Sequence, residues 1–125
     1  FHYNWFGHEH TVVQSQTALS AGPHAVVVDF AYDGGFGQGG DMLLSVDGVP
    51  VAHGRIERTV PIVFSMSGET FDVGIDTGSP VGNYPHHFPC TAKIVGVTLE
   101  RLDEPSPEVR ALIADGEFKA SLSTQ

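Results

Sequence analysis

Acidic side chains gather in one glycine-containing stretch of the chain, and carboxylate oxygens are ligands that calcium prefers. The residues concerned are Glu69, Asp72 and Asp76. Their spacing lacks the Asp-x-Asp-x-Asp-Gly pattern and the terminal Glu of a helical calcium loop. Loop carbonyls could still complete an oxygen shell. The sequence therefore offers these three side chains as candidate ligands for calcium or sodium, with a solvated acidic loop as the alternative.

Aromatic and histidine side chains form the second group with possible chemistry, because ring faces beside polar loops could stack on sugar rings. The candidate ligand-binding residues are Trp5, Tyr32, Tyr84, His86 and His87. The two adjacent histidines would face opposite ways on an extended chain, so they could not easily share a metal. The pair His8 and His10 lies on one strand face, but it lacks a third ligand for zinc.

Two further patterns offer little chemistry. The glycine-rich stretch 33–41 has no nearby Lys and leads into a strand, whereas a phosphate loop needs a Lys and a following helix. We expect a connection between strands there, with a cation site at Asp33 and Asp41 as the alternative. Glu9 with a neighbouring His, or Asp72 with Asp76, could be drawn as acid–base pairs. Proximity in sequence does not establish the hydrogen-bond reach that such catalysis needs.

Composition limits the classes of protein that remain. The chain has 125 residues, 41% of them hydrophobic, which fits one globular domain. Its net charge of −9 disfavours nucleic acid and anionic membrane surfaces as partners. No hydrophobic run approaches the length of a membrane span. A single Cys excludes an internal disulfide and leaves the cellular compartment open.

Alternating apolar residues predict an all-β fold. Residues 26–32 alternate strictly, which predicts a strand with Val26, Val28, Phe30 and Tyr32 on its buried face. Asp47-Gly48 predicts a two-residue hairpin turn between the runs 42–46 and 49–58. Gly54 inside the second run suggests a bulge or a close approach by another backbone. Further strands are expected over 10–16, 60–66 and 90–102.

One short helix is expected near the C-terminus. Ser106 is a suitable N-cap, Pro107 occupies the first helical position and Gly116 ends the segment. Val109, Leu112 and Ile113 form the apolar stripe that should dock on the β-domain or on a missing partner. We therefore predict an antiparallel β-sandwich of six to eight strands over residues 1–104, jelly-roll or lectin-like, followed by a helix and tail over 105–125. A β-barrel is the alternative.

Four stretches of the sequence together resemble a known family. They are Tyr3-Asn4-Trp5-Phe6-Gly7, Phe30 to Gly35 (FAYDGG), Val46 to Thr59 (VDGVPVAHGRIERT) and Glu69 to Val81 (ETFDVGIDTGSPV). In order and spacing, from about Tyr3 to Glu100, the chain resembles the C-terminal β-domain of long-chain bacterial arylsulfatases. The chain lacks an initiator Met and begins in an aromatic cluster, so we expect a piece of a longer polypeptide.

The resemblance implies a parent enzyme that hydrolyses sulfate esters. Such enzymes use calcium and a formylglycine made in a Cys/Ser-x-Pro-x-Arg motif. Cys90 is followed by Thr-Ala-Lys-Ile, so the motif fails at its Pro and Arg positions, and we expect a small buried Cys at the start of a strand. No catalytic residue carries over. The resemblance thus implies a non-catalytic accessory domain that packs against a sulfatase catalytic domain, in a bacterial cytoplasm or periplasm. The alternative is a carbohydrate- or ligand-binding module, calcium-dependent or not.

Overall fold

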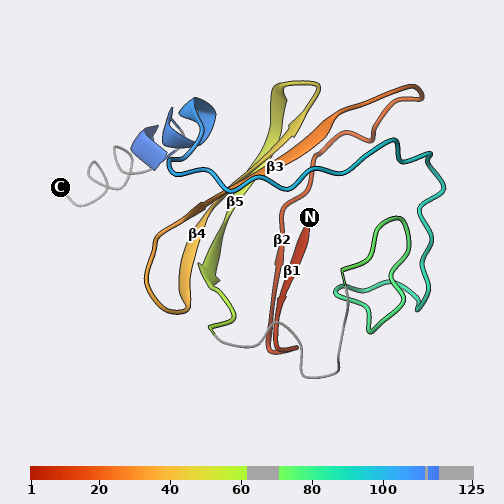
Figure 1. Ribbon diagram of the computed structural model, residues 1–125, viewed down its shortest axis with the longest axis horizontal. Coiled ribbons are helices and arrows are strands. Elements are labelled where there is room, and N and C mark those ends of the chain that lie inside the picture. The colour runs from red at the N-terminus through yellow and green to blue at the C-terminus, as the bar shows by residue number, and fades with distance from the viewer. Residues whose placement is uncertain (62–70, 112, 116–125) are drawn as a thin grey trace.

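A computed structural model describes residues 1–61, 71–111 and 113–115, and this part of the chain is mostly β (Figure 1). It contains five strands: β1 (His2–Trp5), β2 (Glu9–Val12), β3 (Val26–Tyr32), β4 (Gln38–Val46) and β5 (Val49–Arg58). All pairings are antiparallel. Strands β1 and β2 form one two-stranded sheet, and β3, β4 and β5 form a second sheet in that order. Residues 107–111 and 113–115 are helical.

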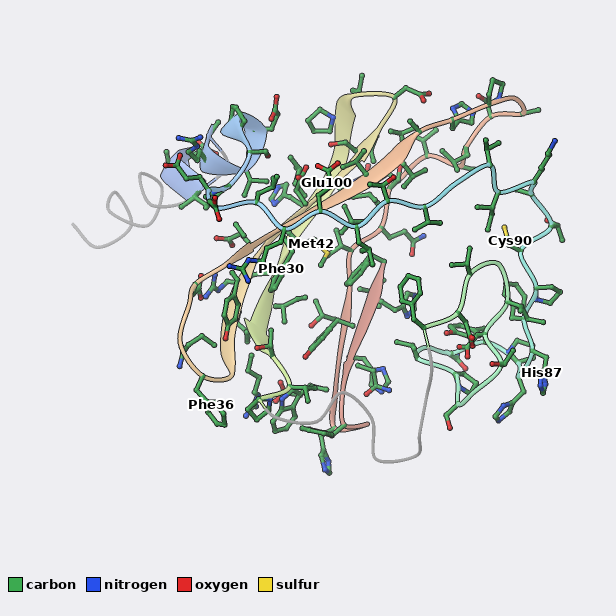
Figure 2. All side chains as sticks on the ribbon, viewed as in Figure 1. Phe30, Phe36, Met42, His87, Cys90 and Glu100 are labelled. Carbon is green, nitrogen blue, oxygen red and sulfur yellow. The ribbon has the colours of Figure 1, made fainter. Side chains whose placement is uncertain are left out.

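Strand β4 is the centre of the fold because it is buried on both faces. Met42 and Leu44 point to one face, where they pack with Val13 and Ile56. Leu43 points to the other face, where it packs with Ala31 and with Val109 and Ile113 of the helical segment. The segment that follows β2 therefore covers one face of the three-stranded sheet and the helix covers the other. Figure 2 shows Met42 in this central position.

The prediction of a buried face on β3 is wrong. Val26, Val28, Phe30 and Tyr32 are 53%, 42%, 41% and 46% exposed. Strand β3 is an edge strand that pairs with β4 alone, and of its residues only Ala31 belongs to a buried cluster. The alternation correctly predicted the strand, but burial also requires a second layer above it. The covering segment reaches β4 and β5, where Val13 contacts Met42 and Ile56.

The turns follow the glycine chemistry in most places. Asp47 and Gly48 have φ values of 52° and 78°, which confirms the predicted hairpin turn. The β3–β4 connection is shorter than predicted, because β4 begins at Gln38 and Gly39 and Gly40 are buried within it. The register shift opposite β5 lies between Leu44 and Ser45 of β4 and not at Gly54.

Gly54 instead permits a close approach by a side chain. A Cβ atom at this position would lie 2.6 Å from Cγ2 of Val13, which is 2% exposed. The absence of a side chain therefore lets the segment after β2 lie directly on β5. The sequence signal was correct about a close contact, although the neighbour is a side chain and not a backbone.

The predicted helix is confirmed within the described residues. The backbone N–H of Val109 donates to Ser106 Oγ at 3.3 Å, as expected for an N-cap. Val109 is 1% exposed and Ile113 packs against the same cluster, so these two residues of the apolar stripe dock on the sheet. Leu112 and Gly116 lie outside the described residues. No helix among the described residues is long and apolar enough to cross a membrane.

The prediction of a strand over 90–102 is also wrong. These residues belong to no strand, and every residue from 85 to 105 is exposed. Within the described segments, no backbone–backbone hydrogen bond joins residues 91–104 to another residue. The predicted strand over 10–16 is confirmed only as β2, the β1 partner was not predicted, and residues 62–66 of the run 60–66 lie outside the described residues.

Candidate functional site

The acidic stretch forms a loop that is held by its own side chains. Asp72 Oδ2 accepts hydrogen bonds from the backbone N–H and hydroxyl of Thr77, at 2.9 and 2.6 Å. Asp76 accepts from the backbone N–H of Gly78 at 3.2 Å and from the Tyr84 hydroxyl at 2.7 Å. Bonding to Asp76 raises the pKa of Tyr84, because the phenol donates to a carboxylate. Both predicted metal ligands therefore act as local loop braces.

Within the described residues, no group of three or more His, Cys, Asp or Glu side chains is arranged to hold a metal ion. Glu69, the third predicted ligand, lies outside the described residues. The loop is closed at its base by a bridge between Ile75 and Pro89 and by a hydrogen bond from Cys90 N to Gly74 O of 2.6 Å. It also contacts β1, since a Cβ atom at Gly82 would lie 2.3 Å from His2 Nδ1.

The predicted ligand-binding rings do not form one surface. The rings of Tyr84 and Phe88 are in tilted contact, with centroids 5.8 Å apart, and the ring centroids of His86 and His87 are 6.3 Å apart. His86 Nδ1 is also 3.1 Å from the carbonyl oxygen of Gly78. Tyr32 is on β3, where its hydroxyl donates to the Gly35 carbonyl and its ring contacts Phe30. Figure 2 shows His87 at the periphery of the molecule, far from Phe30 in this view.

Trp5 takes part in a separate cluster at the end of the β1–β2 hairpin. The Arg58 guanidinium lies 4.4 Å from the indole ring centroid, and Phe6 packs edge-on at 5.4 Å. Arg58 also binds Glu9 through two hydrogen bonds, the one from Nε being 2.9 Å long. This pairing lowers the pKa of Glu9. One face of the indole is therefore covered by a cation, and Trp5 Nε1 is buried without a hydrogen-bond partner in the described structure.

A hydrogen-bonded Ser–His–Asp series, which sequence reasoning missed, joins residues 20–25 to the β4–β5 turn. His24 Nδ1 lies 2.7 Å from Asp47 Oδ2, and Asp47 Oδ1 accepts from the backbone N–H of Ala25 at 2.8 Å. On the other side of the ring, Nε2 lies 3.2 Å from Ser20 Oγ and 3.0 Å from the Ser20 carbonyl oxygen. Only the register of the hairpin brings these residues together.

These contacts clamp residues 20–25 to the β4–β5 turn. A carbonyl oxygen only accepts, so the ring nitrogen facing Ser20 is best used as a donor, as is the nitrogen facing Asp47. A ring that donates from both nitrogens is protonated, and its pKa is raised, chiefly by the Asp47 bond. The pKa of Asp47 is lowered by the Ala25 N–H and then by His24. Only the neutral ring, with Nε2 unprotonated, could accept a hydrogen bond from the Ser20 hydroxyl.

A groove lined mostly by apolar residues lies between residues 71–74 and 90–99. Its volume is about 650 Å³, and its lining includes Phe71, Val73, Ile94, Val95, Val97 and Leu99. Several of these side chains are largely in solvent: Phe71 is 70%, Leu99 79% and Val95 94% exposed. Exposed apolar side chains that adjoin in this way mark interaction surfaces more often than isolated ones do.

Cys90 lies at one end of this groove, and Figure 2 shows it on the outer segment of the chain. The expectation of a buried Cys is wrong, since the residue is exposed. Burial was inferred from a strand start, and no strand forms here. Comparison of the chain with protein-family models, with curated proteins and with solved structures found no match.

Proposed function

We propose that this chain is a non-catalytic accessory domain of an arylsulfatase-type sulfuric ester hydrolase, and that it packs against the catalytic domain of the same polypeptide. The family rests on the sequence resemblance between about Tyr3 and Glu100. The observation that carries the docking role is the apolar groove with its exposed Phe71, Val95 and Leu99. In this proposal calcium and formylglycine belong to the catalytic domain.

The polar clusters support an accessory role because each is committed to holding the fold. Asp76 and Tyr84 brace the loop, Arg58 and Glu9 brace the hairpin, and His24 braces the β4–β5 turn. A hydrolase needs a nucleophile or an activated water beside a general base. The one Ser–His contact in the described residues, that of Ser20 and His24, has its ring nitrogen directed at a carbonyl as well.

We further propose that the two antiparallel sheets form the minimal layers of a β-sandwich. Supporting this, Val13, which directly follows β2, packs with Met42 and Ile56 of the three-stranded sheet, and Tyr3 of β1 is packed against the same cluster. Strand-type residues 91–102 would extend one layer when they find a neighbouring strand. A crystal structure that includes the catalytic domain tests this arrangement directly.

The docking proposal is tested by calorimetric titration of the purified chain into a bacterial arylsulfatase catalytic domain prepared without its own C-terminal domain. We expect saturable binding that is weakened at least tenfold by the double substitution Phe71→Ser and Leu99→Ser. Phe36→Ser is the matched control, because Phe36 is 69% exposed but lies on the β3–β4 connection and not on the groove. No heat of binding at high micromolar concentration, or equal loss with the control, would contradict the proposal.

A further inference from the structure

Two segments of the described chain have backbone groups without a backbone partner, strand β3 along one edge and residues 91–104. Among the described residues, strand β3 pairs with β4 on one side only, so no described residue bonds the N–H and C=O groups of its other edge. Residues 91–104 are exposed and, in the described structure, make no backbone–backbone hydrogen bond to the rest of the chain. Their sequence alternates Val95, Val97 and Leu99, which is typical of a strand. An exposed edge is a template for another strand.

Charge favours pairing between these two edges. Asp29 lies at the centre of β3, is half-buried, and takes part in none of the ion pairs among the described residues. Lys93 and Arg101 supply two of the six basic residues of an otherwise acidic chain, and both are exposed. Placing two β3 edges together about a twofold axis would bring the Asp29 carboxylates near each other. Placing residues 91–96 against β3 sets Lys93 against Asp29 instead.

We propose that a second copy of this chain occupies the free edge of β3, with residues 91–96 of each copy adding an antiparallel strand to β3 of the other. The register that places Lys93 opposite Asp29 places Val95 opposite Val27, and both valines are exposed, by 94% and 45%. A paired strand hydrogen-bonds in the plane of its sheet and projects its side chains out of that plane. The interface thus goes beyond the proposed docking to a catalytic domain and does not depend on it.

The two copies repel each other as whole molecules, because each carries a net charge of −9. At physiological ionic strength the Debye length is about 8 Å, so this long-range repulsion is largely screened while contacts within the interface are screened less. Dimerisation is therefore expected at 150 mM salt and is expected to weaken at 20 mM salt.

Sedimentation equilibrium of the full chain at 150 mM salt, from 1 to 500 µM, tests the proposal. We expect a monomer–dimer equilibrium, with a dissociation constant raised at least tenfold by Ile94→Pro, which removes the backbone donor that faces Val28 in this register. Ile94→Val is the matched control, because it keeps the N–H and the β-branched shape, and it should dimerise within about threefold of the parent chain. Residue 94 makes no backbone hydrogen bond to a described residue, so the thermal midpoint of the Pro variant should match that of the control.

Disulfide trapping tests whether Val27 of one copy lies opposite Val95 of the other. In a Cys90→Ser background, Val27→Cys and Val95→Cys chains should form a covalent heterodimer when mixed, and neither should cross-link efficiently alone. A monomer at every concentration, or a dimer that is insensitive to Ile94→Pro, would overturn the proposal. So would a disulfide that closes within one chain carrying both cysteines. A monomer that still binds the sulfatase catalytic domain would overturn this inference and leave the proposed function standing.

Discussion

Strand β4 and the segment 91–102 both carry apolar residues at every second position and have opposite surroundings. These positions are Met42, Leu44 and Val46 in β4, and Val95, Val97 and Leu99 in the segment. Met42 in β4 is 1% exposed and lies between two paired strands, whereas Val95 in the second segment is 94% exposed. The difference shows that an alternating pattern encodes a preference for a pleated, half-buried environment and not the environment itself. Whether a strand forms depends on a neighbour with free backbone groups and on a layer that covers it.

The largest expected effect is a difference in the free energy of unfolding between a substitution in β4 and one in the segment 91–102. Met42→Ala should lower the free energy of unfolding by about 2–5 kcal/mol, because it leaves a cavity between Val13 and Ile56. Val97→Ala, at a 55% exposed site, should change it by less than about 0.5 kcal/mol. Urea denaturation of both variants, followed by circular dichroism, measures the contrast. Equal losses in the two variants would mean that the segment 91–102 is packed in solution.

A pair of glycines sharpens the same comparison. Gly54→Ala forces a Cβ atom to 2.6 Å from a branched Val13 side chain, so we expect a loss of about 1–3 kcal/mol from overpacking. Gly96→Ala is the control, since its Cβ atom would meet nothing within 4 Å. The control should change the unfolding midpoint little in either direction. A Gly54→Ala chain as stable as the parent would contradict the close contact between β5 and the segment after β2.

The helix cap tests the second face of β4. Ser106→Ala removes the acceptor for the Val109 N–H and should cost about 1 kcal/mol. Ser106→Asn keeps a capping oxygen and should retain most of that stability. Denaturation curves for the two variants distinguish a capping role from a simple loss of volume. If Asn were as harmful as Ala, the capping hydrogen bond would not be the cause.

The smallest expected effect is a pH dependence from the His24 clamp. The pKa of His24 is raised in the folded protein, so its contribution is complete below its usual pKa of about 6.5 and is lost as pH rises through the higher folded value. The pKa of Asp47 is lowered, so its contribution is present above about 3.8 and is lost as pH falls through the lower folded value. The clamp should therefore stabilise most between about pH 4 and 6.5.

Urea midpoints measured from pH 5 to 9 test whether the stabilisation by His24 decreases as pH rises. His24→Gln should be less stable than the parent chain near pH 5.5, and the two curves should converge towards pH 9. His10→Gln, at an exposed position of β2, serves as the control for removing an imidazole. Curves that diverge as pH rises would show that the neutral ring, and not the imidazolium, makes the clamp.

The parts of the fold predictable from sequence were those fixed by local chemistry. The Asp47-Gly48 turn needs positive φ at two adjacent residues, and the helix begins at Ser106 and Pro107, because these residues satisfy local backbone requirements. The exposure of β3 and the absence of a strand over 90–102 could not be predicted, because both depend on which distant segment covers or pairs with these residues. Val13 and Val109, far apart in the sequence, decide which residues of the sheet are buried.

In the candidate site, too, the sequence predicted local features but not the contacts between distant residues. Sequence identified Asp72, Asp76 and Tyr84 as polar loop residues, but it gave no sign that Asp76 would bind the Tyr84 hydroxyl. The His24–Asp47 contact spans 23 residues and arises only from the register of the β3–β4–β5 sheet. The groove was missed because its residues were assigned to a buried strand. An apolar run with Lys93, Glu100 and Arg101 near its ends was the available signal for a strand that is completed by a partner.

Amide hydrogen exchange of the dilute, monomeric chain tests the account most directly. It compares two strand-type sequences in one molecule under the same conditions. We predict slow exchange across the central residues of β4, and exchange near the intrinsic rate for residues 91–102, which becomes slow once a partner covers them. Protection of 91–102 in the monomer to the level of β4 would contradict the claim that this segment needs a second chain or domain to become a strand.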